Sequence, residues 1–98
     1  MEQTTQTNKV NNYDTIHSCL LVIQTYDEVD YHVYPGKKIL EHYQHKYETS
    51  MEKLTIYSTD EEWDLYEKAD QLYLNELQLF IKWYEMQKFK RTKNNIVL

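Results

Sequence analysis

The chain has 98 residues, a formal net charge of −5 and a single cysteine. This length supports one domain with a modest core, and the mildly acidic charge excludes a general nucleic-acid binder. A mean hydropathy of −0.83, with no apolar run longer than Cys19 to Ile23, excludes a membrane-spanning segment. We therefore expect a cytoplasmic protein, in a bacterium or in an infected host cell.

The first third of the chain passes from a polar segment to β-prone segments. Residues 1–15 are polar and lack periodicity, which predicts a flexible N-terminal arm ahead of a single domain at residues 16–98. Residues 16–26 (IHSCLLVIQTY) are apolar at both alternating sets of positions, as in a central strand covered on both faces. Residues 29–34 (VDYHVY) alternate instead, which predicts a half-exposed second strand.

The next segment combines a turn, a short helix and a third strand. Pro35 and Gly36 predict a type II turn, in which the glycine has a positive φ. Residues 37–48 place apolar side chains on one face of a helix, and residues 53–57 (KLTIY) alternate as a short strand does. The predicted fold is therefore α+β, with the order β-β-α-β-α, a small three-stranded sheet and a long amphipathic C-terminal helix.

The strongest signal in the chain is this last helix, predicted at about residues 59–92. Ser58 with Glu61, or Thr59 with Glu62, has the spacing of a capping box. Acidic residues crowd the first turns and basic residues crowd the last, where the helix dipole favours them. Such a helix is about 45 Å long, which exceeds the diameter of so small a domain. Part of its apolar face must therefore contact another protein, most simply a second copy in an antiparallel homodimer.

Apolar side chains cover one arc of this helix from Leu65 to Met86. Aromatic residues on such an arc are typical of interface hot spots, although an aromatic stripe is also typical of a core. Glu76 lies inside the arc, where it either bonds a tyrosine hydroxyl or solvent, or acts as a polar specificity device between helices. We expect a main interface at Leu72, Glu76, Leu79, Trp83 and Met86, and a secondary interface at Trp63, Tyr66, Tyr73 and Tyr84.

Catalytic and metal-binding patterns are weak. His42 and His45 have helical spacing that supplies two ligands, but zinc sites need three or four. The chain has no G-x-S-x-G motif, and its one glycine is too few for a phosphate-binding loop. We therefore expect no catalytic residues, no metal and no cofactor, and thus no enzymatic activity.

The composition also bears on function. One glycine, one proline, one arginine and one alanine stand against ten tyrosines, which indicates an AT-rich genome such as that of a phage or another mobile element. The leading hypothesis is a small non-enzymatic accessory protein that binds and inhibits a host or competing protein. The alternative is a nucleic-acid-associated regulator whose basic C-terminal tail makes the contact, through Lys88, Lys90, Arg91 and Lys93.

Overall fold

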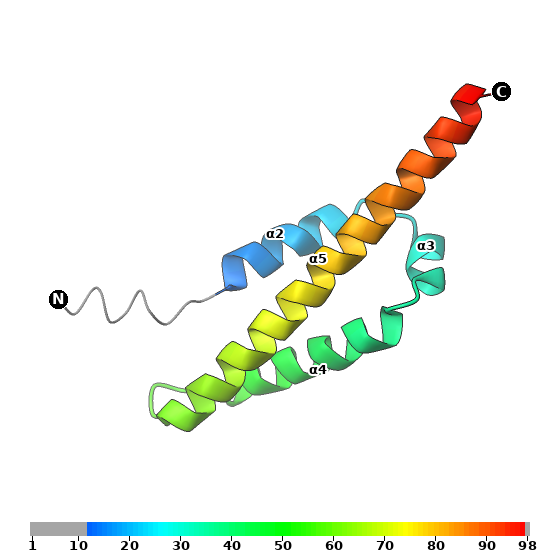
Figure 1. The fold of residues 1–98 in the computed structure, drawn as a ribbon. Helices are drawn as coiled ribbons and strands as arrows, with labels where there is room; N and C mark the ends of the chain where they lie inside the picture. The colour runs from blue at the N-terminus through cyan, green and yellow to red at the C-terminus, as the bar shows by residue number, and fades with distance from the viewer. Residues whose placement is uncertain (1–11, 98) are drawn as a thin grey trace.

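The computed structural model describes residues 12–97, and the side chains of residues 12–91. The regular secondary structure of these residues consists of helices only (Figure 1). The helices are α2 (Tyr13–Ile23), α3 (Glu28–Val33), α4 (Lys37–Lys53) and α5 (Asp60–Val97). Residues 12–97 contain no strand, so the predicted α+β class and its three-stranded sheet are wrong: the described fold is all-helical. Most of the arm predicted at residues 1–15 lies outside the described residues.

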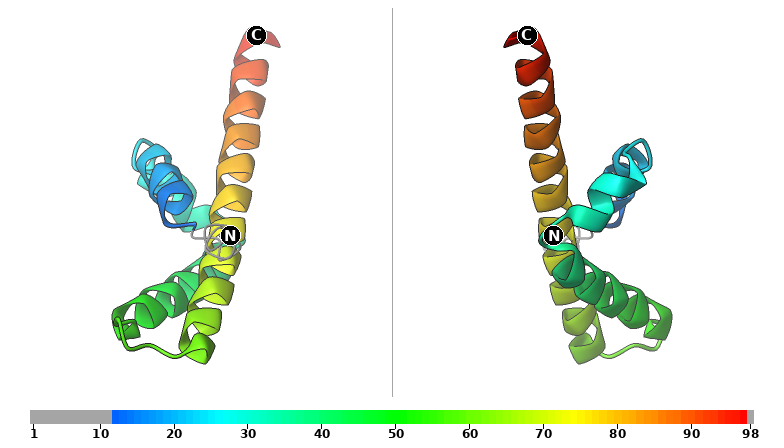
Figure 2. Two further views of the ribbon diagram at one scale, coloured as in Figure 1. Left: turned by 90° about the vertical axis from the view of Figure 1, so that its left-hand side faces the viewer. Right: turned by 90° about the vertical axis from the view of Figure 1, so that its right-hand side faces the viewer.

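Helix α5 is the axis on which the other helices are arranged. It has 38 residues, which corresponds to about 57 Å. Figure 2 shows α2 and α4 on the same side of α5, diverging from each other, while α5 runs past both of them. Helix α5 packs against α4 and against α2, and the short α3 packs against α4. One side of α5 is therefore left uncovered by the other described helices.

Helix α2 occupies the segment predicted as a central strand. Its inward side chains follow a helical spacing of i, i+3, i+4 and i+7, with Ile16 buried and Cys19, Leu20 and Ile23 packed against the core. The intervening apolar side chains of Leu21 and Val22 are exposed. A short run that is apolar at every position fits both periods, and here packing against α5 selects the helix.

Helix α3 replaces the predicted half-exposed strand. Val29 and Val33 are exposed, whereas Asp30 and Tyr34 are buried and Tyr31 is half-buried against the core. The inward positions 30, 31 and 34 follow a helical spacing and not the alternation of a strand. Asp27 precedes the helix in an extended conformation, and its carbonyl accepts a 3.1 Å hydrogen bond from the Asp30 backbone N–H.

The turn at Pro35 and Gly36 is present, but its type differs from the prediction. Gly36 has φ −90° and ψ 13°, and the Lys37 N–H donates to the Tyr34 carbonyl at 3.2 Å, which are the features of a type I turn. The predicted helix at residues 37–48 is confirmed, but it continues to Lys53. The predicted strand at residues 53–57 is therefore wrong, and residues 54–59 form the loop between α4 and α5.

The N-terminus of α5 confirms one of the two predicted capping boxes. The Thr59 N–H donates to Glu62 Oε1 at 2.8 Å, and the Glu62 N–H donates to Thr59 Oγ1 at 3.2 Å. Ser58 has a different role, because its Oγ accepts the Thr55 N–H at 2.7 Å within the loop. The helix then runs to Val97, beyond the predicted end near residue 92.

The core lies between α5 and the diverging pair α2 and α4, and aromatic side chains dominate it. Phe80 is fully buried, and its ring lies 5.9 Å from that of Tyr26, 5.5 Å from Tyr31 and 4.8 Å from Tyr34. Large planar rings fill the space between helices that do not lie parallel. The residues of α5 buried in this core are Tyr66, Ala69, Tyr73, Leu74, Leu77, Phe80 and Tyr84.

Candidate protein-binding face

The predicted apolar arc of α5 divides into two parallel stripes. One stripe is the buried set that packs against α2 and α4. The other stripe keeps large exposed fractions of 63, 42, 52 and 51% along its length. We call this second stripe the exposed ridge, and its residues are Leu65, Leu72, Leu79 and Met86.

The exposed ridge has a regular spacing of seven residues. Seven residues are slightly less than two turns of an α-helix, so successive ridge side chains shift by about 20° around the axis. They form a nearly straight row that a second helix can follow with a gentle left-handed twist. A sustained repeat of this kind is typical of helix pairing, whereas isolated exposed leucines are common on any protein surface.

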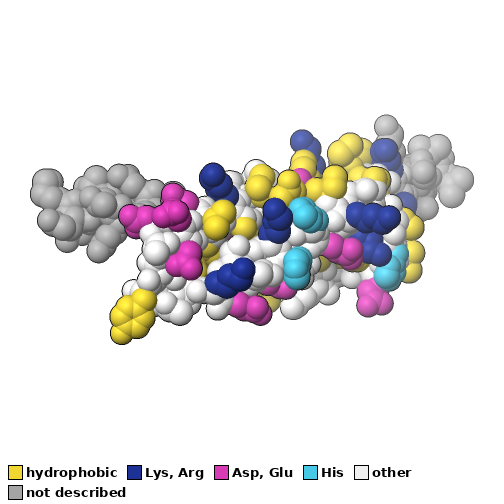
Figure 3. Space-filling model, turned by 90° about the horizontal axis from the view of Figure 1, so that it is seen from below, with side chains coloured by type: hydrophobic (Ala, Val, Ile, Leu, Met, Phe, Trp, Pro, Cys, Tyr) yellow, Lys and Arg dark blue, Asp and Glu magenta, His cyan; other side chains and the backbone are white. Residues whose placement is uncertain are grey.

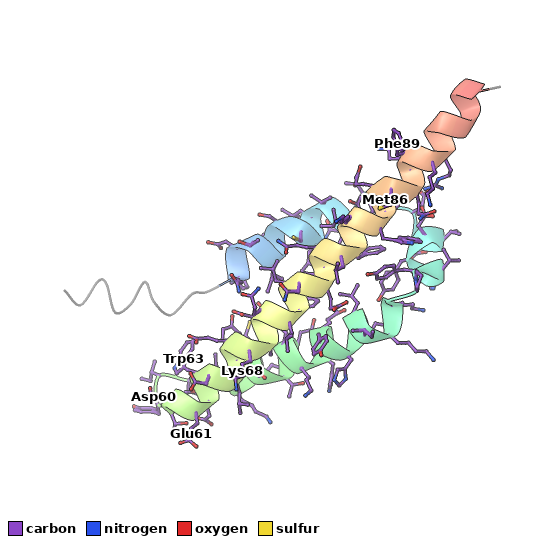
Figure 4. The ribbon with its side chains drawn as sticks, viewed as in Figure 1. Asp60, Glu61, Trp63, Lys68, Met86 and Phe89 are labelled. Carbon is purple, nitrogen blue, oxygen red and sulfur yellow. The ribbon has the colours of Figure 1, made fainter. Side chains whose placement is uncertain are left out.

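Shallow grooves border both ends of the exposed ridge. Near the start of α5, a groove between α4 and α5 includes Leu65, Lys68 and Leu72, together with Tyr43 and Lys46 of α4. Near the other end, a groove on α5 is lined by Lys82, Glu85, Met86, Phe89 and Lys90. Figure 3 shows hydrophobic side chains interspersed with basic ones along the upper edge of the molecule. Figure 4 shows Met86 and Phe89 toward the end of α5 opposite Asp60 and Glu61.

Two residues of the predicted main interface lie beside the exposed ridge. Glu76 is half-buried. The pKa of Tyr34 is raised mainly by the burial of Tyr34 itself, and the nearby charge of Glu76 is a second cause. Trp83 is also half-buried, with its ring 5.1 Å from Tyr34 and 6.2 Å from Phe80. Both side chains therefore connect the ridge to the core, while Leu72, Leu79 and Met86 face outward.

The predicted secondary interface is located mostly in the core. Tyr66, Tyr73 and Tyr84 are buried against the other helices. Trp63 lies at the edge of the molecule, with its ring perpendicular to that of Tyr66 at 5.9 Å. The three tyrosines are therefore core residues and are not part of an exposed contact surface on α5.

Known proteins offer no guide to this surface. Comparisons with protein-family models, curated proteins and solved structures return no match to this chain. The exposed ridge is consequently interpreted from its own geometry, spacing and charge. Among residues 12–97, no helix has the length and apolar character needed to cross a membrane.

The basic tail is partly engaged within the chain. Arg91 donates from Nη2 to Asp30 Oδ2 at 3.3 Å, which joins α5 directly to α3. Lys88 and Lys90 are exposed. The side chain of Lys93 lies outside the described residues. One of the four predicted nucleic-acid contacts therefore has a structural role in this fold.

Asp70 is a notable polar residue that the sequence interpretation missed. It is 1% exposed on α5, and Asn12 donates to its carboxylate from Nδ2 at 3.2 Å and from the backbone N–H at 3.4 Å. Burial raises the pKa of Asp70, and the two Asn12 hydrogen bonds oppose that shift. Asp70 lies one helical turn from Tyr66 and from Tyr73, on the buried stripe. That spacing is the signal in the sequence that could have identified Asp70 as a buried residue.

A pocket of about 310 Å³ opens between α2, α3, α4 and α5, because α2 and α4 diverge. Among the residues that the structure describes, no lysine or arginine lines it, so no cationic side chain in the pocket can pair with an anion. Within the described residues, no three His, Cys, Asp or Glu side chains gather to hold a metal, and His42 and His45 are exposed on α4. The pocket is lined by Leu20, Ile23, Gln24, Tyr26, Asp27, Glu28, Tyr31, Leu40, Gln44, Tyr73, Leu77 and Phe80.

Proposed function

We propose that this chain is a non-enzymatic protein-binding module whose contact surface is the exposed ridge of α5. The observation that carries the proposal is the row of four large apolar side chains at seven-residue spacing on α5, which the other described helices leave uncovered. A row of large exposed apolar side chains on one face of a helix is typical of a protein contact, because leaving it in water is costly.

The regular spacing favours a helical partner. A helix that lies along the exposed ridge can insert its own side chains between Leu72 and Leu79, as in knobs-into-holes packing. Lys68 and Lys82 lie on the same side of α5 as the ridge, where their long aliphatic stems cover the rim while the ammonium groups stay in water. Leu72 and Leu79 are therefore the central anchors.

We further propose that this binding inhibits the partner, as an accessory protein of a phage or mobile element does within the cytoplasm of its host. A module that covers a partner's helix-binding surface can block that surface without catalysis. The AT-rich composition and the small size of the chain support this assignment. The nucleic-acid alternative has less support, because Arg91 is paired with Asp30.

Comparison of a ridge variant with a matched control tests the proposal. The variant Leu72→Ser/Leu79→Ser removes the two central anchors, whereas Leu21→Ser changes a leucine of α2 that is 51% exposed, nearly the same as Leu79 at 52%. Each protein is immobilised and exposed to a bacterial lysate and to soluble copies of itself. Wild type and Leu21→Ser should retain the same bound protein, and the ridge variant should lose it. Equal retention by all three proteins would refute the proposed surface.

A further inference from the structure

We infer that the partner covering the exposed ridge is a second copy of this chain, packed antiparallel through α5 around a two-fold axis near residues 75 and 76. This inference rests on the proposed function, because it requires the ridge to be a protein contact. It adds the identity, direction and register of the partner.

The register follows from the symmetry of the ridge itself. The midpoint between Leu65 and Met86 coincides with the midpoint between Leu72 and Leu79, and both lie between residues 75 and 76. When a second α5 is reversed about this point, Leu65 faces the partner's Met86. Leu72 likewise faces the partner's Leu79. Every ridge side chain thus meets an apolar side chain, and each contact occurs twice, as it does in a two-fold interface between identical copies.

Charge selects the antiparallel direction. Residues 60–68 carry five acidic side chains and one basic side chain, a net charge of −4. Residues 82–93 carry five basic side chains and one acidic side chain, a net charge of +4. An antiparallel pair places the acidic segment of each copy beside the basic segment of the other, with Glu61 facing the partner's Lys90. A parallel pair would place like charges together at both ends, which disfavours it.

The two grooves support the same direction. The groove at Leu65 and Leu72 lies at the acidic end of α5, and the groove at Met86 and Phe89 lies at the basic end. In the antiparallel register, each groove of one copy faces the other groove of its partner. Phe89, which is 66% exposed, would then reach the groove at Leu65 in the second copy. The apolar residues at both ends are covered by one contact.

Disulfide formation between introduced cysteines tests direction and register together. The background is Cys19→Ala, which removes the native thiol. Leu65→Cys/Met86→Cys places two thiols 21 residues apart on one helix, about 32 Å, so they cannot join within a chain. Mild oxidation should convert most of this double variant to a covalent dimer, whereas either single variant should give at least several-fold less. Circular dichroism should show the same helix content for all variants, because both positions are exposed.

Each other outcome overturns the inference. A covalent dimer that forms as well from Leu65→Cys alone would show a parallel pair. No covalent dimer from any variant, with a monomer mass at high micromolar concentration, would reject pairing of the ridge with a second copy. In that case, lysate capture that is still lost in Leu72→Ser/Leu79→Ser would preserve the proposed function while rejecting self-pairing. Capture that is unaffected by those substitutions would reject both.

Discussion

Arg91 near the end of α5 donates a hydrogen bond to the largely buried carboxylate of Asp30 in α3, 61 residues earlier in the chain. This pair joins α3 and α5 directly, in addition to their shared packing on α4. The Tyr31 ring of α3 and the Tyr34 ring just after it contact Phe80 in the core, beside this ion pair. A residue predicted as a possible nucleic-acid contact is thus paired within the chain.

Loss of Arg91 should therefore lower the stability of the protein. Arg91→Ala leaves the Asp30 carboxylate buried without its charged partner, and we expect a loss of about 1 kcal/mol, since the arginine itself is half exposed. Lys88→Ala, which changes an exposed lysine three residues earlier, is the matched control and should have no measurable effect. Urea unfolding measures both variants. Equal stability of the two would show that the ion pair does not hold α3.

The pH dependence of stability should contain a contribution from Asp70. Burial raises the pKa of Asp70 above its ordinary value of 3.8. Between pH 3.8 and the folded pKa, the folded chain therefore binds more protons at Asp70 than the unfolded chain does. The contribution of Asp70 to stability is therefore full below pH 3.8 and is lost as pH rises through its folded pKa. Asp70→Asn cannot titrate, so wild type should lose stability relative to the variant as pH rises above 3.8 and through the folded pKa. Parallel curves for the two proteins would contradict a raised pKa.

Alkaline unfolding should reflect the buried tyrosines. Burial, with a further contribution from the charge of Glu48, raises the pKa of Tyr73 from 10.0 to about 12. The folded chain retains this proton when the unfolded chain has lost it, so stability should fall as pH rises from 10 toward 12. Tyr73→Phe removes the titrating group and should make this fall shallower. Thermal unfolding across this pH range, with phenolate absorbance as a second readout, checks the expectation. An unchanged slope would place the Tyr73 hydroxyl in water.

The division of α5 into buried and exposed stripes is testable with two leucines that lie two residues apart. Leu77 is 2% exposed and Leu79 is 52% exposed. Leu77→Ala should cost about 2 to 4 kcal/mol, because it opens a cavity in the core. Leu79→Ala, measured below the concentration at which the chain associates, should cost less than about 0.5 kcal/mol. Chemical unfolding separates the two results, and similar losses would show that the stripes are misassigned.

The sequence was sufficient for the features that local interactions determine. The capping box of Thr59 and Glu62, the charge gradient of α5 and the start of α4 depend on residues close together in the chain. Local patterns failed where tertiary packing decides. Residues 16–23 are apolar enough to satisfy a strand or a helix, and only contact with α5 makes the i, i+3, i+4, i+7 set of Ile16, Cys19, Leu20 and Ile23 the relevant one.

The candidate surface was partly predictable for the same reason. The length of α5 predicts that part of its apolar arc contacts another protein. The predicted main interface includes Leu72, Leu79 and Met86, which the structure leaves exposed. Which half of the arc is covered depends on where α2 and α4 pack. The sequence does not show where α4 packs, so it cannot distinguish an interface tyrosine from a core one. The rings of Tyr66 and Tyr73, predicted in the secondary interface, contact Tyr47 of α4 in the core.

Sedimentation equilibrium over a wide dilution series tests the central claim most directly, namely that the exposed ridge of α5 is a protein contact occupied by a second copy. Wild type and Leu21→Ser should pass reversibly from dimer to monomer on dilution, with a dissociation constant in the micromolar range, and added salt should weaken the dimer. Leu72→Ser/Leu79→Ser should remain a folded monomer at every concentration. A wild-type monomer throughout, or a ridge variant that dimerises as well as wild type, would contradict the claim.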